Sequence, residues 1–149
     1  MDTIRLKARA KINLGLDVVR RREDGYHEVR MVMQMLKLYD QIDIEKNRDT
    51  GHPADMQIYP SCRRMSAILL TKRRKVMMEQ FDIKQGVCIR IEKHIPVAAG
   101  MAGGSSNAAA VLYGMNQMFR LGLSQKELME RGVKLGRDVP YCIMRGTVL

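Results

Sequence analysis

Hydrophobic and polar residues alternate along most of the first half of the chain. A period of two is typical of β-strands with one buried face, because successive side chains of a strand point to opposite sides of the sheet. The alternation predicts strands over Ile4–Ala8, Ile12–Val18, Val29–Leu38, Gln41–Glu45 and Val87–Glu92. Between the second and the third, Arg22-Glu23-Asp24-Gly25 carries the Asp-Gly pair that favours a hairpin turn.

The second half of the chain is predicted to be helical. Small residues and then larger apolar residues recur at helical spacing between Ser105 and Leu121, and Gly122 stands where a left-handed residue would end such a helix. Ser124-Gln125-Lys126-Glu127 has the pattern of a capping box, which predicts a second helix that runs to about Gly136. Strands followed by helices indicate an α+β fold.

The composition fits one globular domain, or one domain cut from a larger protein. The 149 residues are 46% hydrophobic and 28% charged, which is enough apolar material to bury a core. No apolar run approaches the roughly 18–20 residues that a membrane-spanning helix needs. The first five residues also lack the apolar core of a secretory signal. We therefore expect no membrane partner.

The three cysteines, Cys62, Cys88 and Cys142, are odd in number and widely spaced. This spacing gives neither a disulfide framework nor a metal-binding motif, so no metal site is predicted. Free thiols of this kind are usually buried or half-buried, and they fit a reducing compartment best. A cytoplasmic location is therefore expected.

The formal net charge of +10 raises the question of nucleic-acid binding. The excess is uneven, because residues 51–75 hold six basic residues against the single acid Asp55. Elsewhere basic and acidic residues are interspersed, and two Phe and five Tyr with no Trp offer few platforms for stacking bases. We expect no nucleic-acid partner, and a basic RNA-binding module remains the weaker hypothesis.

The most informative segment connects the last predicted strand to the first predicted helix. It reads Pro96-Val97-Ala98-Ala99-Gly100-Met101-Ala102-Gly103-Gly104-Ser105-Ser106. Its glycines let backbone amides close around an anion, and a helix start adds N–H groups and the positive end of the helix dipole. The two serines add hydroxyls that can bond phosphate or a metal-bound water. The segment lacks the Gly-Lys-Ser/Thr of a Walker motif, and a tight turn packed on a sheet is the alternative.

Two charged residues stand in unusual surroundings. Lys11 lies on a predicted strand among small and apolar neighbours, and Asp138 follows Gly136 just after a predicted helix, ahead of an extended segment. Each has an ordinary explanation by itself, because a lone lysine is usually solvated and a lone aspartate at such a place usually caps or turns the chain. Only together with the glycine-rich segment do they indicate a site.

Four motifs together resemble the GHMP superfamily of small-molecule kinases. They are, in this order, Ala10-Lys11-Ile12-Asn13-Leu14, Asp24-Gly25-Tyr26-His27, the segment 96–106 and Gly136-Arg137-Asp138-Val139-Pro140. The glycine-rich segment specifies the superfamily. The second motif narrows the resemblance to the member of non-mevalonate isoprenoid synthesis that acts on 4-diphosphocytidyl-2-C-methyl-D-erythritol, or CDP-methylerythritol. The resemblance covers residues 4–46 and 76–149.

The resemblance implies a fold like the second domain of ribosomal protein S5, with a mostly antiparallel sheet packed on helices. It implies that the phosphates of ATP lie over the glycine-rich segment and that the γ-phosphoryl group passes to a hydroxyl of the erythritol moiety. It also implies Mg²⁺, which would bridge the phosphates and be held largely by the nucleotide and water instead of a protein metal site.

The resemblance also assigns roles to individual residues. Asp138 matches the base that orients or deprotonates the hydroxyl, and Lys11 matches its cationic partner. Tyr26 and His27 match the residues that hold the cytosine, the first by stacking and the second by bonding the base edge. Asn13 is placed to assist near the reacting hydroxyl. Without the motif, Tyr26 would be interpreted as a packed hairpin ring and His27 as a surface histidine.

The resemblance further predicts a part that this chain lacks. The family continues into a second, ferredoxin-like domain that closes the active-site cleft, whereas the sequence stops at Leu149, in what should be a strand. Residues 1–149 are therefore interpreted as the N-terminal, ATP-binding domain alone. A fragment that binds nucleotide weakly or not at all, and has no turnover, is the alternative to a working kinase.

The resemblance vanishes over about Gly51–Lys75, where the arginines cluster. The family has a segment of the type Pro-Thr-Asp-Glu-Arg-Asn-Ile-Ala-Tyr-Lys-Ala-Ala-Lys there. When each codon of Cys62–Lys75 is started at its third base, permitted codons give this segment residue for residue. We therefore interpret residues 51–75 as a tract read out of frame between two compensating shifts. The tract loses the family's asparagine, which resembles a contact to the adenine of ATP.

Overall fold

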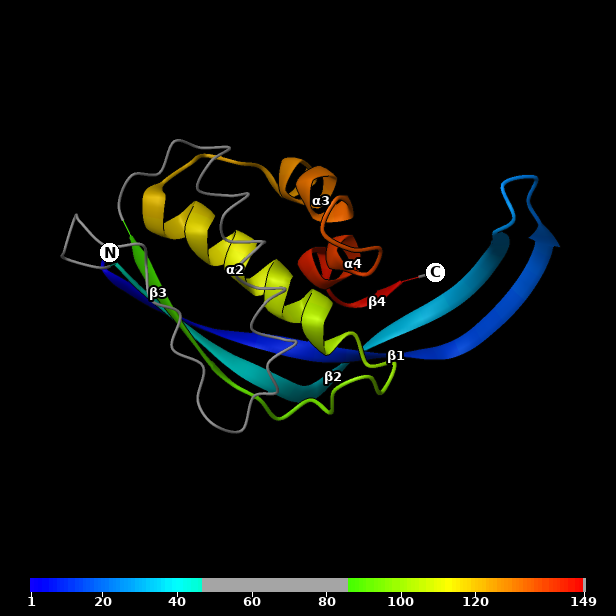
Figure 1. Ribbon diagram of the computed structural model, residues 1–149, viewed down its shortest axis with the longest axis horizontal. Helices are drawn as coiled ribbons and strands as arrows, with labels where there is room; N and C mark the ends of the chain where they lie inside the picture. Colours follow the sequence, from blue (N-terminus) through cyan, green and yellow to red (C-terminus); the bar gives the residue numbers. More distant parts are fainter. Residues whose placement is uncertain (47–85, 149) are drawn as a thin grey trace.

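The computed structural model describes residues 1–46 and 86–148 and shows a sheet with helices on one side (Figure 1). Its strands are β1 (Thr3–Arg21), β2 (His27–Lys46), β3 (Val87–Glu92) and β4 (Thr147–Val148). The order is β1-β2-β3, β4 pairs with β2, and every pair is antiparallel. The helices are α2 (Gly103–Phe119), α3 (Gln125–Val133) and α4 (Val139–Met144). The predicted α+β fold is confirmed, whereas the tract 51–75 lies outside the described residues.

The alternation of side chains along the strands forms the core between the sheet and α2. Ile42 of β2 stands opposite Leu6 of β1 and Ile91 of β3, and two residues along the strand Ile44 stands opposite Ile4 and an isoleucine of β3. The apolar face of α2 closes this layer with the buried residues Ala108, Val111, Leu112, Met115 and Met118. Full burial of each large side chain contributes roughly 1.5–3 kcal/mol to stability.

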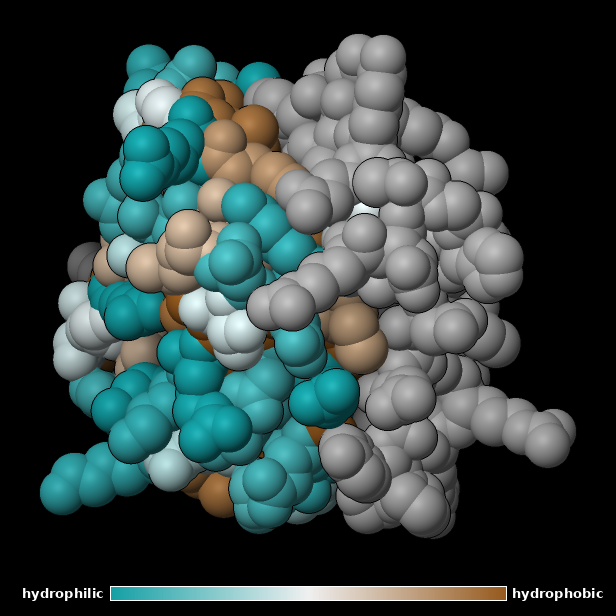
Figure 2. Space-filling view, turned by 90° about the vertical axis from the view of Figure 1, so that its left-hand side faces the viewer, coloured by the Kyte–Doolittle hydropathy of each residue, from teal (hydrophilic) through white to brown (hydrophobic). Residues whose placement is uncertain are grey.

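The opposite side chains of the same strands form a charged outer row. Arg5 donates to Asp43 over 2.7 Å, Asp43 stands opposite Arg90, and Arg90 lies 3.6 Å from Glu45. Figure 2 shows that the described part of one end of the molecule is mostly hydrophilic, with small hydrophobic patches. These basic residues alternate with acids, as the interspersed charges of the sequence predict.

The prediction of four short strands before residue 46 is wrong, because β1 and β2 are each continuous. The register of β1 against β2 shifts at three places, between Arg9 and Lys11, Asn13 and Gly15, and Val18 and Arg20. Each irregularity interrupts the period of two, so a single long strand has the sequence pattern of two shorter ones.

Beyond the helices, β1 and β2 continue as a two-stranded arm (Figure 1). The predicted turn at its tip is confirmed. The Gly25 N–H donates to the Arg22 carbonyl over 3.1 Å, and φ of Gly25 is +83°, a conformation that glycine adopts without strain. The arm exposes the apolar side chains of Leu14, Leu16, Val18, Val19 and Val29.

The helices differ from the prediction mainly at their ends. The helix predicted for 105–121 is α2, and its left-handed end residue is Arg120 at φ +52°, with Gly122 following at φ +70°. The capping box is confirmed, since Ser124 and Glu127 bond each other's backbone N–H groups, but α3 ends at Val133. None of the helices in the described ranges is long and apolar enough to cross a membrane.

The segment after Asp138 is helical and not extended as predicted. Pro140 lies in the first turn of α4, where its fixed φ and missing N–H fit a helix start. The strand expected at the end of the chain is confirmed as β4, whose Thr147 and Val148 pair with Gln34 and Met33 of β2.

Replacement of Gly114 by Val is expected to destabilise the domain by about 2 kcal/mol, because this glycine lets α2 approach the sheet closely. A Cβ there would stand 2.6 Å from Cδ1 of Ile44 and 2.9 Å from Cδ1 of Leu6. Urea unfolding followed by circular dichroism measures the change. Gln117→Val, on the exposed side of the same helix, is the matched control and should change the unfolding free energy by less than about 0.5 kcal/mol. Equal effects of the two substitutions would contradict the packing argument.

Candidate active site

Lys11 lies where β1 changes its pairing with β2. The register shift leaves Ala10 outside the pairing, and Ala10 and Lys11 are 0% and 4% exposed. Consecutive residues of a regular strand point to opposite sides, so the irregularity allows both to be buried. The lysine side chain therefore reaches the helices instead of the solvent.

The ammonium group of Lys11 connects two other residues that the sequence singled out. It donates to the side-chain oxygen of Asn13 over 3.0 Å and lies 3.4 Å from a carboxylate oxygen of Asp138. The side chain of Lys11 is 5% exposed and that of Asp138 is 37% exposed. A buried ammonium group needs such partners, and the carboxylate that it holds remains accessible to a small molecule.

The glycine-rich segment lies beside this cluster. The Lys11 N–H donates to the carbonyl of Met101 over 3.1 Å. The backbone has φ +61° at Ala98, +71° at Gly100 and +55° at Ala102. Left-handed alanines are uncommon, and strained backbone conformations are enriched at functional sites. Residues 96–100 are exposed, so a phosphate group could reach their backbone.

The helix α2 begins at the end of this segment. Ala102 is its cap residue, no side chain caps it, and its first turn contains no acidic residue. The positive end of the helix dipole is thus not neutralised by a carboxylate of the first turn, which favours an anion there. Gly103 is needed for space, because a Cβ at this position would lie 3.1 Å from Cγ2 of Ile95 and 3.2 Å from Nζ of Lys93.

The two serines of the segment differ in their surroundings. Ser106 is 3% exposed, and its hydroxyl donates to the carbonyl of Arg9 over 2.6 Å, which fastens α2 to β1. Ser105 is half-buried. The phosphate contacts expected of both hydroxyls remain predictions, and Ser105 is the better placed of the two.

The tip of the arm lies against the residue before Asp138. The guanidinium carbon of Arg137 is 4.5 Å from the ring centre of Tyr26, a cation–π distance, and Tyr26 is 56% exposed. His27 is exposed at the start of β2, opposite Arg21. Tyr26 therefore stands at the edge of the site, and the cytosine contacts of Tyr26 and His27 remain predictions.

Sequence reasoning missed Asp40, a carboxylate near the same segment. Asp40 is fully buried and forms an ion pair with Lys93. A signal was present, because Asp40 shares the period-two face of Ile42 and Ile44, where an acidic residue is unexpected.

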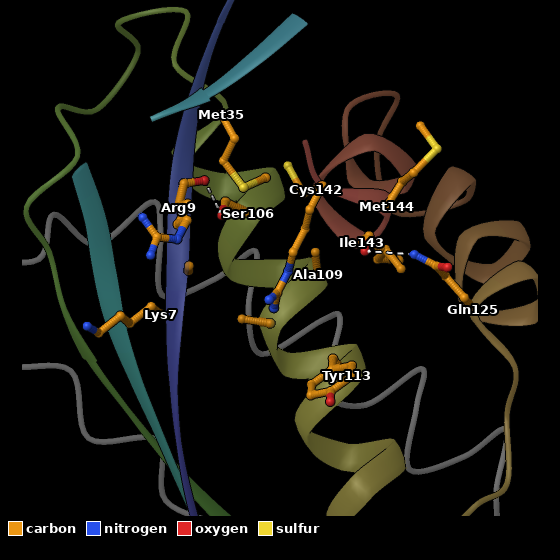
Figure 3. Close-up of a pocket in the computed structure, with 13 residues that line it drawn as sticks. Lys7, Arg9, Met35, Ser106, Ala109, Tyr113, Gln125, Cys142, Ile143 and Met144 are labelled. Atoms are coloured by element: carbon orange, nitrogen blue, oxygen red, sulfur yellow. Dashed lines mark hydrogen bonds between the residues drawn. The ribbon is translucent and has the colours of Figure 1, made fainter. Parts of the chain in front are cut away.

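A cavity of about 230 Å³ lies between β1, α2 and α4 (Figure 3). Its lining includes Met35, Tyr113, Gln125 and Cys142, and Ser106 is the one predicted site residue among the residues that line it. The side chains of Lys7 and Arg9 point away from α2, across β1 (Figure 3). The candidate active site is therefore the open surface at the glycine-rich segment and not this cavity.

Burial raises the pKa of Cys142 to about 12, and the nearby charge of Asp138 adds to the effect. The thiolate is the reactive form, so only about one thiol in 10⁴ is ionised at pH 8. We expect iodoacetamide to modify Cys142 at least about 50-fold more slowly in the native protein than in urea. Mass spectrometry of the peptide measures this rate, and the half-buried Cys88 in the same sample is the internal comparison. Equal rates of modification of Cys142 in the native and the unfolded protein would refute the raised pKa of this thiol.

Comparisons with known proteins show which family the chain belongs to. Residues 67–146 match the model described as the GHMP kinases N terminal domain. The chain is 49% identical over 152 residues to the 4-diphosphocytidyl-2-C-methyl-D-erythritol kinase of Alkaliphilus metalliredigens (strain QYMF), and 51% identical over 151 residues to that of Lachnoclostridium phytofermentans. Each alignment covers 100% of this chain and 51% of the relative, so the chain spans about half the length of these curated relatives.

Solved structures show the same relationship. The crystal structure of a 4-(cytidine 5'-diphospho)-2C-methyl-D-erythritol kinase is similar with a TM-score of 0.78 and 32% identity, over 95% of this chain and 49% of that one. A mevalonate pyrophosphate decarboxylase from Streptococcus pyogenes is similar with a TM-score of 0.66 at 16% identity, over 96% of this chain and 45% of that one, and so shares the fold.

Proposed function

This chain belongs to the GHMP kinase family, and we propose that it is the N-terminal half of an ATP-dependent kinase for CDP-methylerythritol. The resemblance stated from the motifs is confirmed at the level of the family. The observation that carries the proposal is the double role of Lys11, whose ammonium group holds Asp138 and whose backbone N–H binds the glycine-rich segment at Met101. One residue thus joins a candidate base to a candidate phosphate site.

The proposed reaction uses these residues in turn. Backbone N–H groups of residues 97–104, at the loop and the start of α2, hold the phosphates of ATP. Asp138 accepts the proton of the erythritol hydroxyl. At the same time the hydroxyl oxygen bonds to the γ-phosphorus, and the bond from that phosphorus to the β–γ bridging oxygen breaks. Lys11 keeps the carboxylate in place and offsets charge near the acceptor. The products are ADP and the phosphorylated substrate.

Magnesium fits the proposed site as a companion of the nucleotide. In residues 1–46 and 86–148, no group of three or more His, Cys, Asp or Glu side chains could hold a metal ion. Ser105 and Asp138 have side-chain oxygen atoms that could contact the ion or its waters. When bound, Mg²⁺ neutralises phosphate charge.

Substrate specificity is proposed to lie at the tip of the arm. The guanidinium group of Arg137 lies over the ring of Tyr26. Tyr26 remains more than half exposed, so its ring could accept a cytosine by stacking. The imidazole of His27 would bond the edge of the base.

The free thiols of Cys88 and Cys142 agree with the proposed cytoplasmic location.

A turnover assay tests the proposal. ADP release is measured with CDP-methylerythritol for the chain alone and for the chain joined to the C-terminal half of a relative. We expect turnover in the joined protein. Nucleotide binding without turnover in the joined protein would support the second candidate, an inactive nucleotide-binding fragment. Salt-sensitive RNA binding with no ATP binding would refute both.

The frame change proposed for residues 51–75 needs a separate test, because this tract lies outside the described residues. The test is to sequence the gene and to translate this tract in the frame that starts at the third base of each present codon. Absence of the asparagine-containing family segment from that frame would refute the interpretation.

A further inference from the structure

The candidate phosphate loop, defined here as residues 96–102, is held at its far end by β1. The carbonyl of Met101 accepts the N–H of Lys11, and just beyond the loop the Ser106 hydroxyl donates to the carbonyl of Arg9. Residues 96–100 are exposed. A loop that must present its backbone to a ligand needs an equivalent attachment at its near end, since ordering a free loop upon binding weakens affinity.

Asp40 provides that attachment from β2. One oxygen of its carboxylate accepts the N–H of His94 over 2.7 Å and the N–H of Ile95 over 2.8 Å. The other oxygen forms the ion pair with Lys93, whose side chain is 7% exposed. Asp40 itself is 0% exposed. Hydrogen bonds from backbone N–H groups to a buried carboxylate are strong, so these three bonds fix the chain directly before Pro96.

The residues that Asp40 fixes are also those that touch the start of α2. Nζ of Lys93 and Cγ2 of Ile95 lie 3.2 and 3.1 Å from the place where a Cβ of Gly103 would stand. An ammonium group is unfavourable at the positive end of a helix dipole, and the adjacent carboxylate of Asp40 compensates for it. Asp40 thus controls both the near end of the loop and the contact surface of the first residue of α2.

We propose that Asp40 is a positioning residue for nucleotide binding. It holds His94, Ile95 and Lys93 so that the candidate phosphate loop and the start of α2 have their binding conformation before ATP arrives. The inference rests on the proposed function, because it assumes that this loop receives the phosphates. No contact between Asp40 and the nucleotide is required.

Two double variants separate this role from a general effect on stability. Asp40→Asn with Lys93→Met, and Asp40→Ala with Lys93→Met, both remove the ion pair as a unit and so avoid an unpaired buried charge. Only asparagine keeps an acceptor oxygen for the N–H groups of His94 and Ile95. The difference between the two variants therefore measures the attachment of the loop, and asparagine serves as the conservative rescue.

Amide hydrogen exchange measured by NMR and ATP titration calorimetry are the two readouts. Relative to the asparagine variant, the alanine variant should exchange the His94 and Ile95 amides at least about 100-fold faster. It should bind ATP about tenfold more weakly. Exchange at Ile89 and Ile91 in the core of β3 should differ by less than about threefold.

The opposite results would overturn the inference. Equal exchange of His94 and Ile95 in the two variants would refute the attachment, and equal ATP affinity despite faster exchange would refute its role in binding. Faster exchange throughout β3 would show that Asp40 acts only on overall stability. If the unaltered chain binds no ATP, the proposed function fails, and the exchange comparison still decides whether Asp40 holds the loop.

Discussion

Replacement of Asp138 by Asn is expected to lower kcat by about 10²- to 10⁴-fold in a protein that joins this chain to the C-terminal half of a relative. Asparagine has nearly the same shape but cannot accept the proton of the attacking hydroxyl. The Kd of ATP should change by less than about threefold, because the proposed nucleotide site is formed by the loop and the start of α2, whereas Asp138 precedes α4. Single-turnover kinetics and calorimetry measure the two quantities separately.

A matched control distinguishes the role of this carboxylate from a loss of charge. Asp43 lies on the outer face of the sheet beside Arg5, away from the cluster around Lys11. Asp43→Asn removes the same charge and should leave kcat within about twofold. A parallel loss of ATP affinity and rate in the Asp138 variant would count against its assignment as the base.

The motifs predicted which residues meet, and the backbone explains how they meet. Lys11 and Asp138 are far apart in the sequence, yet their side chains lie 3.4 Å apart as the shared motifs imply. Alternation alone predicts one strand before Lys11 and another after it, and says nothing of the register shift after Arg9 that accompanies the burial of this lysine. Pairing irregularities depend on the partner strand, so one strand's sequence does not reveal them.

The sequence does not predict the helix α4, because its conformation also depends on residues elsewhere in the chain. Val139–Met144 has six residues, too few for a helical period to be recognised, and Pro140 suggests an extended chain when read alone. The helix is held by its neighbours: Val139, Tyr141 and Cys142 are buried, and Val139 packs within 2.9 Å of the position that a Cβ of Gly132 would occupy. Tertiary packing decides the conformation of such short segments.

Asp40 shows a different limit of the sequence. Its buried position follows from the period of β2, but its purpose depends on Lys93, His94 and Ile95, more than fifty residues later. A buried carboxylate predicts that partners exist without saying which they are. Only the antiparallel pairing of β2 with β3 brings those partners to it.

Replacement of Gly103 by Val is expected to weaken ATP binding by about 30- to 100-fold. The physical reason is crowding and not backbone conformation, because φ of Gly103 lies outside the left-handed region, unlike that of Gly100. A Cβ would already stand 3.1 Å from Cγ2 of Ile95, and the two methyl groups of valine would add to this contact. The start of α2 must then shift away from Ile95 and Lys93, which moves the N–H groups that would receive the phosphates.

Calorimetric titration with ATP and urea unfolding of the same variant measure this effect. Gly103→Ala adds the Cβ alone and should weaken ATP binding by only about threefold, since the neighbours need to give by a few tenths of an ångström. The free energy of unfolding should fall by about 1–3 kcal/mol in the valine variant, as expected for overpacking. A folded Gly103→Val protein with unchanged ATP affinity would remove residues 96–104 from the proposed nucleotide site, because a shifted helix start could not then be part of it.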